Sequence, residues 1–125
     1  MKQWIGRWLI GVSAIHTVFA AVVFKETLTT IIKRGVFDTI GEDPMLGAVA
    51  WFVLFGLVLF ISGLAIAELE KSPSRPLPKS LGWSLLALGI VGVALMPASG
   101  LWLAFPPALA VLFRKAAATS APPAA

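Results

Sequence analysis

The chain contains no cysteine, and only 13% of its 125 residues are charged. Without cysteine it cannot form disulfides, thiolate metal sites or a catalytic thiol. The low share of charge accompanies a hydrophobic share of 58% and a mean hydropathy of +0.92. Soluble domains are about 45–50% apolar, because polar side chains must cover their core. The composition therefore predicts a membrane protein.

Motifs for catalysis and nucleotide binding are missing as well. The sequence has a single histidine and no phosphate-binding glycine loop, His-Glu-x-x-His motif or nucleophile elbow. One histidine without a paired acid, thiol or metal cluster is a poor catalytic set, so we expect neither an enzyme nor a metal site. The residues identify no cofactor. Basic residues give a net charge of +4 but are spread over loops and ends, which argues against a nucleic-acid partner.

Apolar stretches dominate what is present. The two longest, 9–24 and 45–67, reach the roughly 20 residues that cross a hydrocarbon core of about 30 Å once their flanks are counted. A third apolar region, 80–113, is broken by Pro97 and Gly100, which suit a tight hairpin between two shorter helices. The predicted fold is an all-α antiparallel bundle of four transmembrane helices, with spans at about 4–24, 45–67, 80–96 and 99–113.

These spans are expected to form one domain, residues 1–115, followed by a disordered tail, 116–125. The first span is expected to be retained, because no small-residue cleavage site follows it. In the first loop, apolar residues recur at helical spacing among polar ones, which predicts a short amphipathic helix that either lies flat on the outer leaflet or caps the bundle. Its apolar positions are Leu28, Ile31, Ile32, Val36 and Phe37.

The distribution of basic residues predicts the orientation. With four spans, the N-terminal segment, the second loop and the C-terminal tail share one side of the membrane. The first loop, on the other side, carries three basic residues together with four acidic ones. The positive-inside rule therefore places both termini in the cytoplasm. The seven basic residues of the cytoplasmic side are Lys2, Arg7, Lys71, Arg75, Lys79, Arg114 and Lys115.

His16 is the one ionisable residue buried within a predicted span. Such a group is costly in a membrane, so it should face the bundle interior and have a partner. Ser13, three residues earlier, lies on the same helix face and is placed to hydrogen-bond its ring. Three functional interpretations are a proton relay, a haem or metal ligand completed by a symmetry mate, and a polar contact for a quinone or lipid. The structural interpretation is a neutral histidine bonded to a neighbouring helix.

Pro106 and Pro107 interrupt the fourth apolar stretch. We expect them to remove two backbone hydrogen bonds in mid-helix, and so to kink or unwind the helix. Carbonyl groups freed in a membrane need partners. The candidate residues for ligand binding or a proton relay are therefore His16, Ser13, Pro106 and Pro107.

Acidic residues flank the spans. Glu68 and Glu70 follow the second span, and as a pair of carboxylates they suggest acid–base chemistry. Because Lys71 adjoins Glu70, we interpret both instead as solvated helix flanks. The segment 42–44, Glu-Asp-Pro, either binds a cation or caps the second span at its N-terminus, where negative charge is favourable.

Glycines recur inside the spans at heptad spacing. Small residues at such intervals let helices approach closely. We interpret them as positions of intramolecular packing, and the alternative is an oligomer interface. They are Gly56, Gly63, Gly82 and Gly89, with Gly92 nearby.

Three segments together support a resemblance. They are the opening Trp4-Ile-Gly-Arg-Trp-Leu-Ile-Gly with His16 after it, Trp51-Phe52 at the start of the second span, and the Pro-x-x-Gly-x-Trp turn at 97–102. Over nearly its whole length the chain resembles a family of small bacterial four-helix membrane proteins with no agreed activity. The resemblance implies a multi-pass protein of the bacterial cytoplasmic (inner) membrane and adds nothing about mechanism.

Two functional hypotheses follow. The first is a non-enzymatic membrane protein that binds an apolar small molecule, a lipid or a partner membrane subunit in a cavity near His16 and the proline pair. The alternative is a small transporter or channel, working as a homo-oligomer, in which His16 titrates. A closed apolar cavity would favour the first hypothesis and a continuous wet pathway the second.

Overall fold

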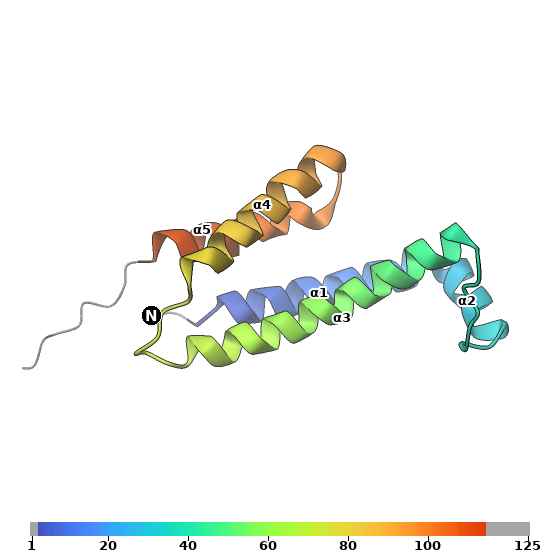
Figure 1. Ribbon diagram of the computed structural model, residues 1–125, viewed down its shortest axis with the longest axis horizontal. Coiled ribbons are helices and arrows are strands. Elements are labelled where there is room, and N and C mark those ends of the chain that lie inside the picture. The colour runs from blue at the N-terminus through green and yellow to red at the C-terminus, as the bar shows by residue number, and fades with distance from the viewer. Residues whose placement is uncertain (1–2, 115–125) are drawn as a thin grey trace, which may run out of the picture. The chain divides into compact units, whose positions relative to one another are not determined.

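The structure, a computed structural model, describes residues 3–114. Within that range it contains five α-helices, one 3-10 helix and no strands (Figure 1). The all-α fold class is therefore confirmed. The predicted disordered tail lies outside the described residues, as do Lys2 and Lys115. The elements are α1 (Ile5–Val23), α2 (Lys25–Lys33), α3 (Pro44–Glu70), α4 (Lys79–Leu95), the 3-10 helix η1 (Gly100–Ala104) and α5 (Phe105–Phe113).

Two of these helices, α1 and α3, are long and apolar enough to cross a membrane. At 1.5 Å per residue, the 19 residues of α1 extend about 28 Å and the 27 residues of α3 about 40 Å. The 17 residues of α4 extend only about 25 Å. Helix length therefore supports two spans.

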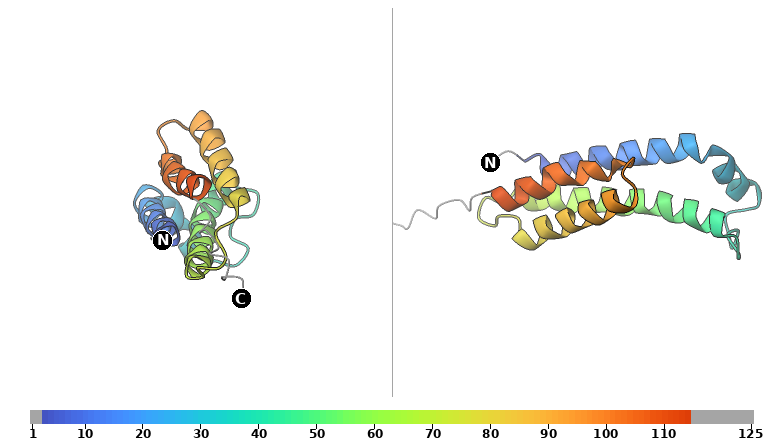
Figure 2. Two further views of the ribbon diagram at one scale, coloured as in Figure 1. Left: turned by 90° about the vertical axis from the view of Figure 1, so that its left-hand side faces the viewer. Right: turned by 90° about the horizontal axis from the view of Figure 1, so that it is seen from above.

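The chain divides into two compact units. The helical-pair unit is Arg7–Leu64, and the terminal unit comprises residues 3–6 and 65–114 of the part of the chain that the structure describes. In the helical-pair unit, α1 and α3 lie side by side (Figures 1 and 2). They run antiparallel, because Ser13 bonds to Gly56 whereas His16, later in α1, contacts Phe52, earlier in α3.

An acidic cap begins α3. The Asp43 Oδ1 atom accepts the backbone N–H groups of Met45 at 3.0 Å and Leu46 at 3.3 Å. Pro44 occupies the first helical position, where its missing N–H would have had no intrahelical partner. The capping interpretation of this segment is confirmed.

The amphipathic helix of the first loop is shorter than predicted. It ends at Lys33, because Gly35 adopts a φ of +80° and its N–H donates to the Ile32 carbonyl at 3.2 Å. This left-handed turn is the ordinary end of a helix. Val36 and Phe37 therefore lie beyond the helix, with Phe37 96% exposed.

In the terminal unit, α4 packs against η1 and α5 as a hairpin (Figure 2). The turn between them is closed by the Ser99 N–H, which donates to the Met96 carbonyl at 3.1 Å. Buried glycines line the α4 side of the contact. A Cβ atom at Gly82 would lie 2.8 Å from Leu112, and one at Gly89 would lie 3.3 Å from Phe105. The interpretation of these two glycines as packing positions is confirmed.

Candidate functional site

Ser13 and His16 lie on the face of α1 that packs against α3. The Ser13 hydroxyl donates to the Gly56 carbonyl at 2.8 Å, and His16 Nε2 lies 2.8 Å from the Phe52 carbonyl oxygen. A carbonyl oxygen only accepts, so Nε2 carries the proton in this contact. The two acceptors are about one turn apart on α3. The structure thus brings Ser13 and His16 together on one face, each bonded to the backbone of the neighbouring helix. The predicted contact of Ser13 with the His16 ring is corrected, because the hydroxyl bonds to Gly56 instead.

Aromatic rings surround the imidazole of His16. It stacks on Phe52 with ring centroids 4.0 Å apart and meets the edge of Phe55 at 5.5 Å. Gly56 makes room for it, since a Cβ atom there would lie 3.0 Å from His16 Cδ2 and from Thr17 Oγ1. A haem or metal ligand role at Nε2 would require the bond to Phe52 to break. The geometry is that of a histidine joining two helices.

Pro106 and Pro107 belong to the terminal unit, whereas Ser13 and His16 belong to the helical-pair unit. Both prolines lie in the first turn of α5, where N–H groups have no intrahelical partner. They therefore cost no mid-helix hydrogen bonds, and this part of the prediction is corrected. The chain instead enters α5 through the 3-10 helix η1. Pro107 is buried in the core of its unit, and Pro106 is exposed.

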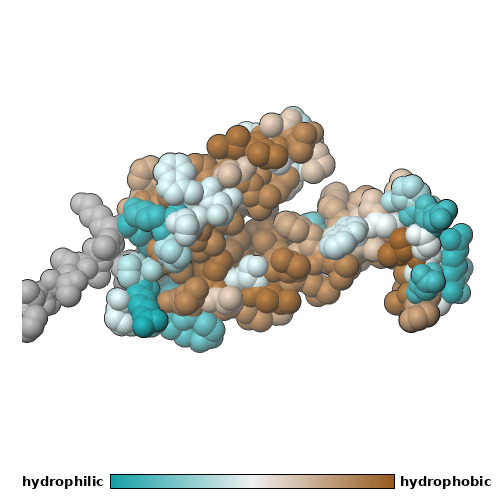
Figure 3. Space-filling model, viewed as in Figure 1, coloured by the Kyte–Doolittle hydropathy of each residue, from teal (hydrophilic) through white to brown (hydrophobic). Residues whose placement is uncertain are grey.

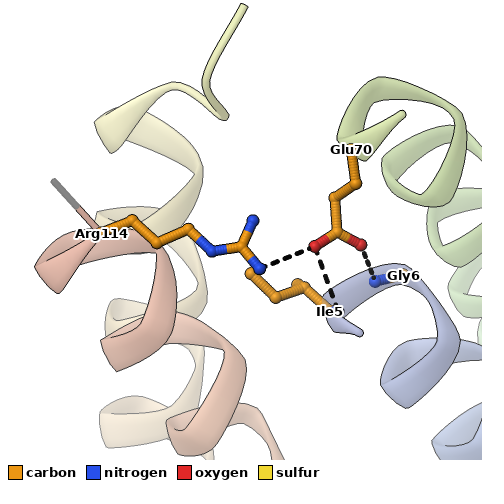
Figure 4. A network of polar contacts seen from close by, with 4 residues as sticks. All are labelled: Ile5, Gly6, Glu70 and Arg114. Atoms are coloured by element: carbon orange, nitrogen blue, oxygen red, sulfur yellow. Dashed lines mark hydrogen bonds and ion pairs between the residues drawn. The ribbon is translucent and has the colours of Figure 1, made fainter. Parts of the chain in front are cut away.

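A second polar cluster surrounds Glu70, the last residue of α3 (Figure 4). Its side chain is 1% exposed. Oε1 accepts the backbone N–H of Ile5 at 3.3 Å and lies 3.0 Å from Arg114 Nη2, and Oε2 accepts the N–H of Gly6 at 2.9 Å. Ile5 and Gly6 begin α1, where N–H groups lack intrahelical partners and the helix dipole is positive. The carboxylate thus caps α1 from a distant segment and pairs with the residue after α5.

The solvated-flank interpretation is right for Glu68 and wrong for Glu70. Glu68 is exposed and pairs with Lys71 at 2.6 Å, whereas Glu70 is buried. Heptad spacing is the signal in the sequence that could have predicted the burial of Glu70, since Gly56, Gly63 and Glu70 follow one another at intervals of seven residues. Residues at this spacing share a helix face, and both of these glycines are buried.

The remaining predicted features concern cavities and metals. The pockets beside Glu70 and beside α2 have neither His16 nor the two prolines in their walls. Within residues 3–114, no group of three or more His, Cys, Asp or Glu side chains is placed to hold a metal ion. Neither pocket therefore forms a cavity at His16 or at the proline pair.

Comparison with known protein families gives a match over almost the whole chain. A family of unknown function, DUF6463, matches residues 1–118. The chain belongs to the DUF6463 family. No curated protein and no solved structure matches it. The expectation of a family without an assigned activity is confirmed, and membership supplies no substrate or mechanism.

Proposed function

We propose that the chain is a non-enzymatic, four-span protein of the bacterial inner membrane that binds a lipid or another apolar molecule, or a partner membrane subunit. The observation that carries the proposal is the exposure of its apolar helices. Only 28% of an 18-residue stretch of α1 and 22% of one in α3 are buried. In water, exposed apolar surface costs about 25 cal/mol per Å². Lipid accepts such a surface without that cost.

The distribution of polarity supports the same proposal. Hydrophobic residues cover the visible surface along α1 and α3, and hydrophilic residues gather around α2 (Figure 3). Exposed large side chains on these two helices include Phe19, Val22, Trp51 and Ile61. A band of this kind, bounded by polar segments, is typical of helices that meet the hydrocarbon core.

The shorter helices fit a membrane only with adjustment. The segment Gly100–Phe113 extends about 24 Å as a 3-10 turn followed by an α-helix. Helices shorter than the hydrocarbon core are accommodated by local thinning of the bilayer and by flanking side chains that reach the interface. Trp83 and Trp102, both exposed and both near the start of their helices, supply such interfacial anchors. With four spans, the positive-inside rule favours cytoplasmic termini.

Native mass spectrometry of the protein in mild detergent, with identification of bound lipids and cofactors, tests this function. The proposal predicts a stoichiometric apolar molecule or a defined partner membrane subunit. A discrete homo-oligomer that carries neither would contradict it and favour transport. An absorption spectrum with a haem band would contradict the structural role of His16.

His16→Leu is expected to lower the free energy of unfolding by about 1 kcal/mol, because it removes one interhelical hydrogen bond. The bound molecule should remain, since the imidazole bonds to the Phe52 carbonyl of α3 and is not needed to hold a ligand. Thr17→Val is the matched control, because the Thr17 hydroxyl bonds only to the Ser13 carbonyl of its own helix. Thermal unfolding in detergent measures the stability of both variants. Loss of the bound molecule in His16→Leu at unchanged stability would make His16 a ligand contact instead.

A further inference from the structure

A pocket opens beside Glu70 in the terminal unit. It has a volume of about 300 Å³, at the lower end of the roughly 300–1,000 Å³ that ligand pockets occupy. Its wall comes from three parts of the chain, namely the N-terminal segment, the loop after α3 and the end of α5. The polar side chains in the wall are Gln3, Glu70, Lys71, Ser72, Arg75 and Arg114.

Positive charge predominates in this wall. Three cationic side chains, those of Lys71, Arg75 and Arg114, face one carboxylate, that of Glu70. The carboxylate is already satisfied by two backbone N–H groups and the Arg114 guanidinium. Its negative charge is therefore compensated, and it does not prevent an anion from entering the pocket.

Two of the cations are available to a ligand. Among the described residues, no hydrogen bond or ion pair holds the Arg75 guanidinium. Lys71 pairs with Glu68, but the two side chains are 61% and 71% exposed. Exposed pairs of this kind contribute little, about 0–1 kcal/mol, so Lys71 can exchange its partner. Arg and Lys side chains are the usual partners of phosphate oxygens.

We infer that this pocket binds a phosphate group, supplied by the headgroup of an anionic lipid. The inference rests on the proposed membrane location. The pocket lies directly after Glu70, where the apolar helix α3 gives way to the polar loop 71–78, which is the level of lipid phosphates if α3 crosses the bilayer. Basic pockets at the cytoplasmic ends of transmembrane helices recognise anionic headgroups in this way.

The test compares lipids and variants by native mass spectrometry of the full chain. In one arm the protein is offered phosphatidylglycerol and phosphatidylcholine in equal amounts, and in the other arm inorganic phosphate alone. We expect a preference for phosphatidylglycerol that falls about fivefold in Arg75→Gln and further in the double variant with Lys71→Gln. The matched control is Arg34→Gln, which removes an exposed cation outside the pocket.

Retention of phosphatidylglycerol identifies a lipid source, binding of inorganic phosphate identifies a soluble one, and both support the site. An unchanged preference in Arg75→Gln, or an equal fall in Arg34→Gln, overturns it, as does binding of neither probe. Carbonate extraction of cell membranes that contain the protein measures independently whether the chain is integrated into the bilayer. If the chain integrates into the bilayer but binds neither phosphatidylglycerol preferentially nor inorganic phosphate, the phosphate site is refuted and the proposed membrane location still holds.

Discussion

Glu70→Ala is expected to lower the free energy of unfolding by about 3 kcal/mol. The substitution leaves the Arg114 guanidinium without its carboxylate and the N–H groups of Ile5 and Gly6 without their acceptor. Breaking a buried pair from one side costs about 3–5 kcal/mol. The lower end applies because Arg114 is 20% exposed and can regain contact with water. Thermal unfolding in detergent, followed by circular dichroism, measures the loss.

Glu68→Ala is the control for this substitution. It removes the same side chain two residues earlier on α3, but from an exposed pair with Lys71. We expect a change of no more than about 1 kcal/mol. Equal effects of the two substitutions would show that Glu70 is solvated and that the cluster does not hold the helix ends.

Gly6→Ala is expected to lower the free energy of unfolding by about 3 kcal/mol, the upper end of the usual cost of overpacking. A Cβ atom at Gly6 would lie 2.5 Å from the Ala67 Cα and 2.6 Å from its Cβ. No rotamer change relieves this contact, because the obstacle is the backbone of α3. The helices would have to separate, which would also lengthen the bond from the Gly6 N–H to Glu70. The same unfolding assay measures the effect.

Gly11→Ala, on the same helix, is the control for Gly6→Ala. A Cβ atom there meets nothing within 4 Å, and alanine is a better helix former than glycine by about 1 kcal/mol. We therefore expect unchanged or increased stability. A stable Gly6→Ala variant would contradict the close approach of α1 and α3 at this end.

Much of the fold could be predicted from local sequence. Long apolar runs predict α1 and α3. Pro97 and Gly100 predict the turn of the hairpin, and Asp43 indicates the start of α3. Each of these features depends on neighbouring residues only. The early end of α2 could not be predicted in this way, because the apolar spacing continues to Phe37 while the left-handed turn at Gly35 decides the boundary.

The polar site could be predicted only in part. The shared face of Ser13 and His16 follows from helical spacing, but their acceptors on α3 follow from pairing between distant segments. Burial of Glu70 has the same origin, since its partners lie at the start of α1 and after α5. The effect of the proline pair could not be predicted for another reason. It depends on where the α-helix begins, and the 3-10 turn before Phe105 moves that point.

Labelling of single-cysteine variants distinguishes four membrane spans, with both termini in the cytoplasm, from two. The chain has no native cysteine, so Glu42→Cys, Ser74→Cys and Ala98→Cys each report one loop to a membrane-impermeant maleimide in intact cells. We expect labelling at positions 42 and 98, and at 74 only after permeabilisation. Protection of position 98 together with labelling of 42 would mean that only α1 and α3 cross the membrane, and would contradict the four-span account.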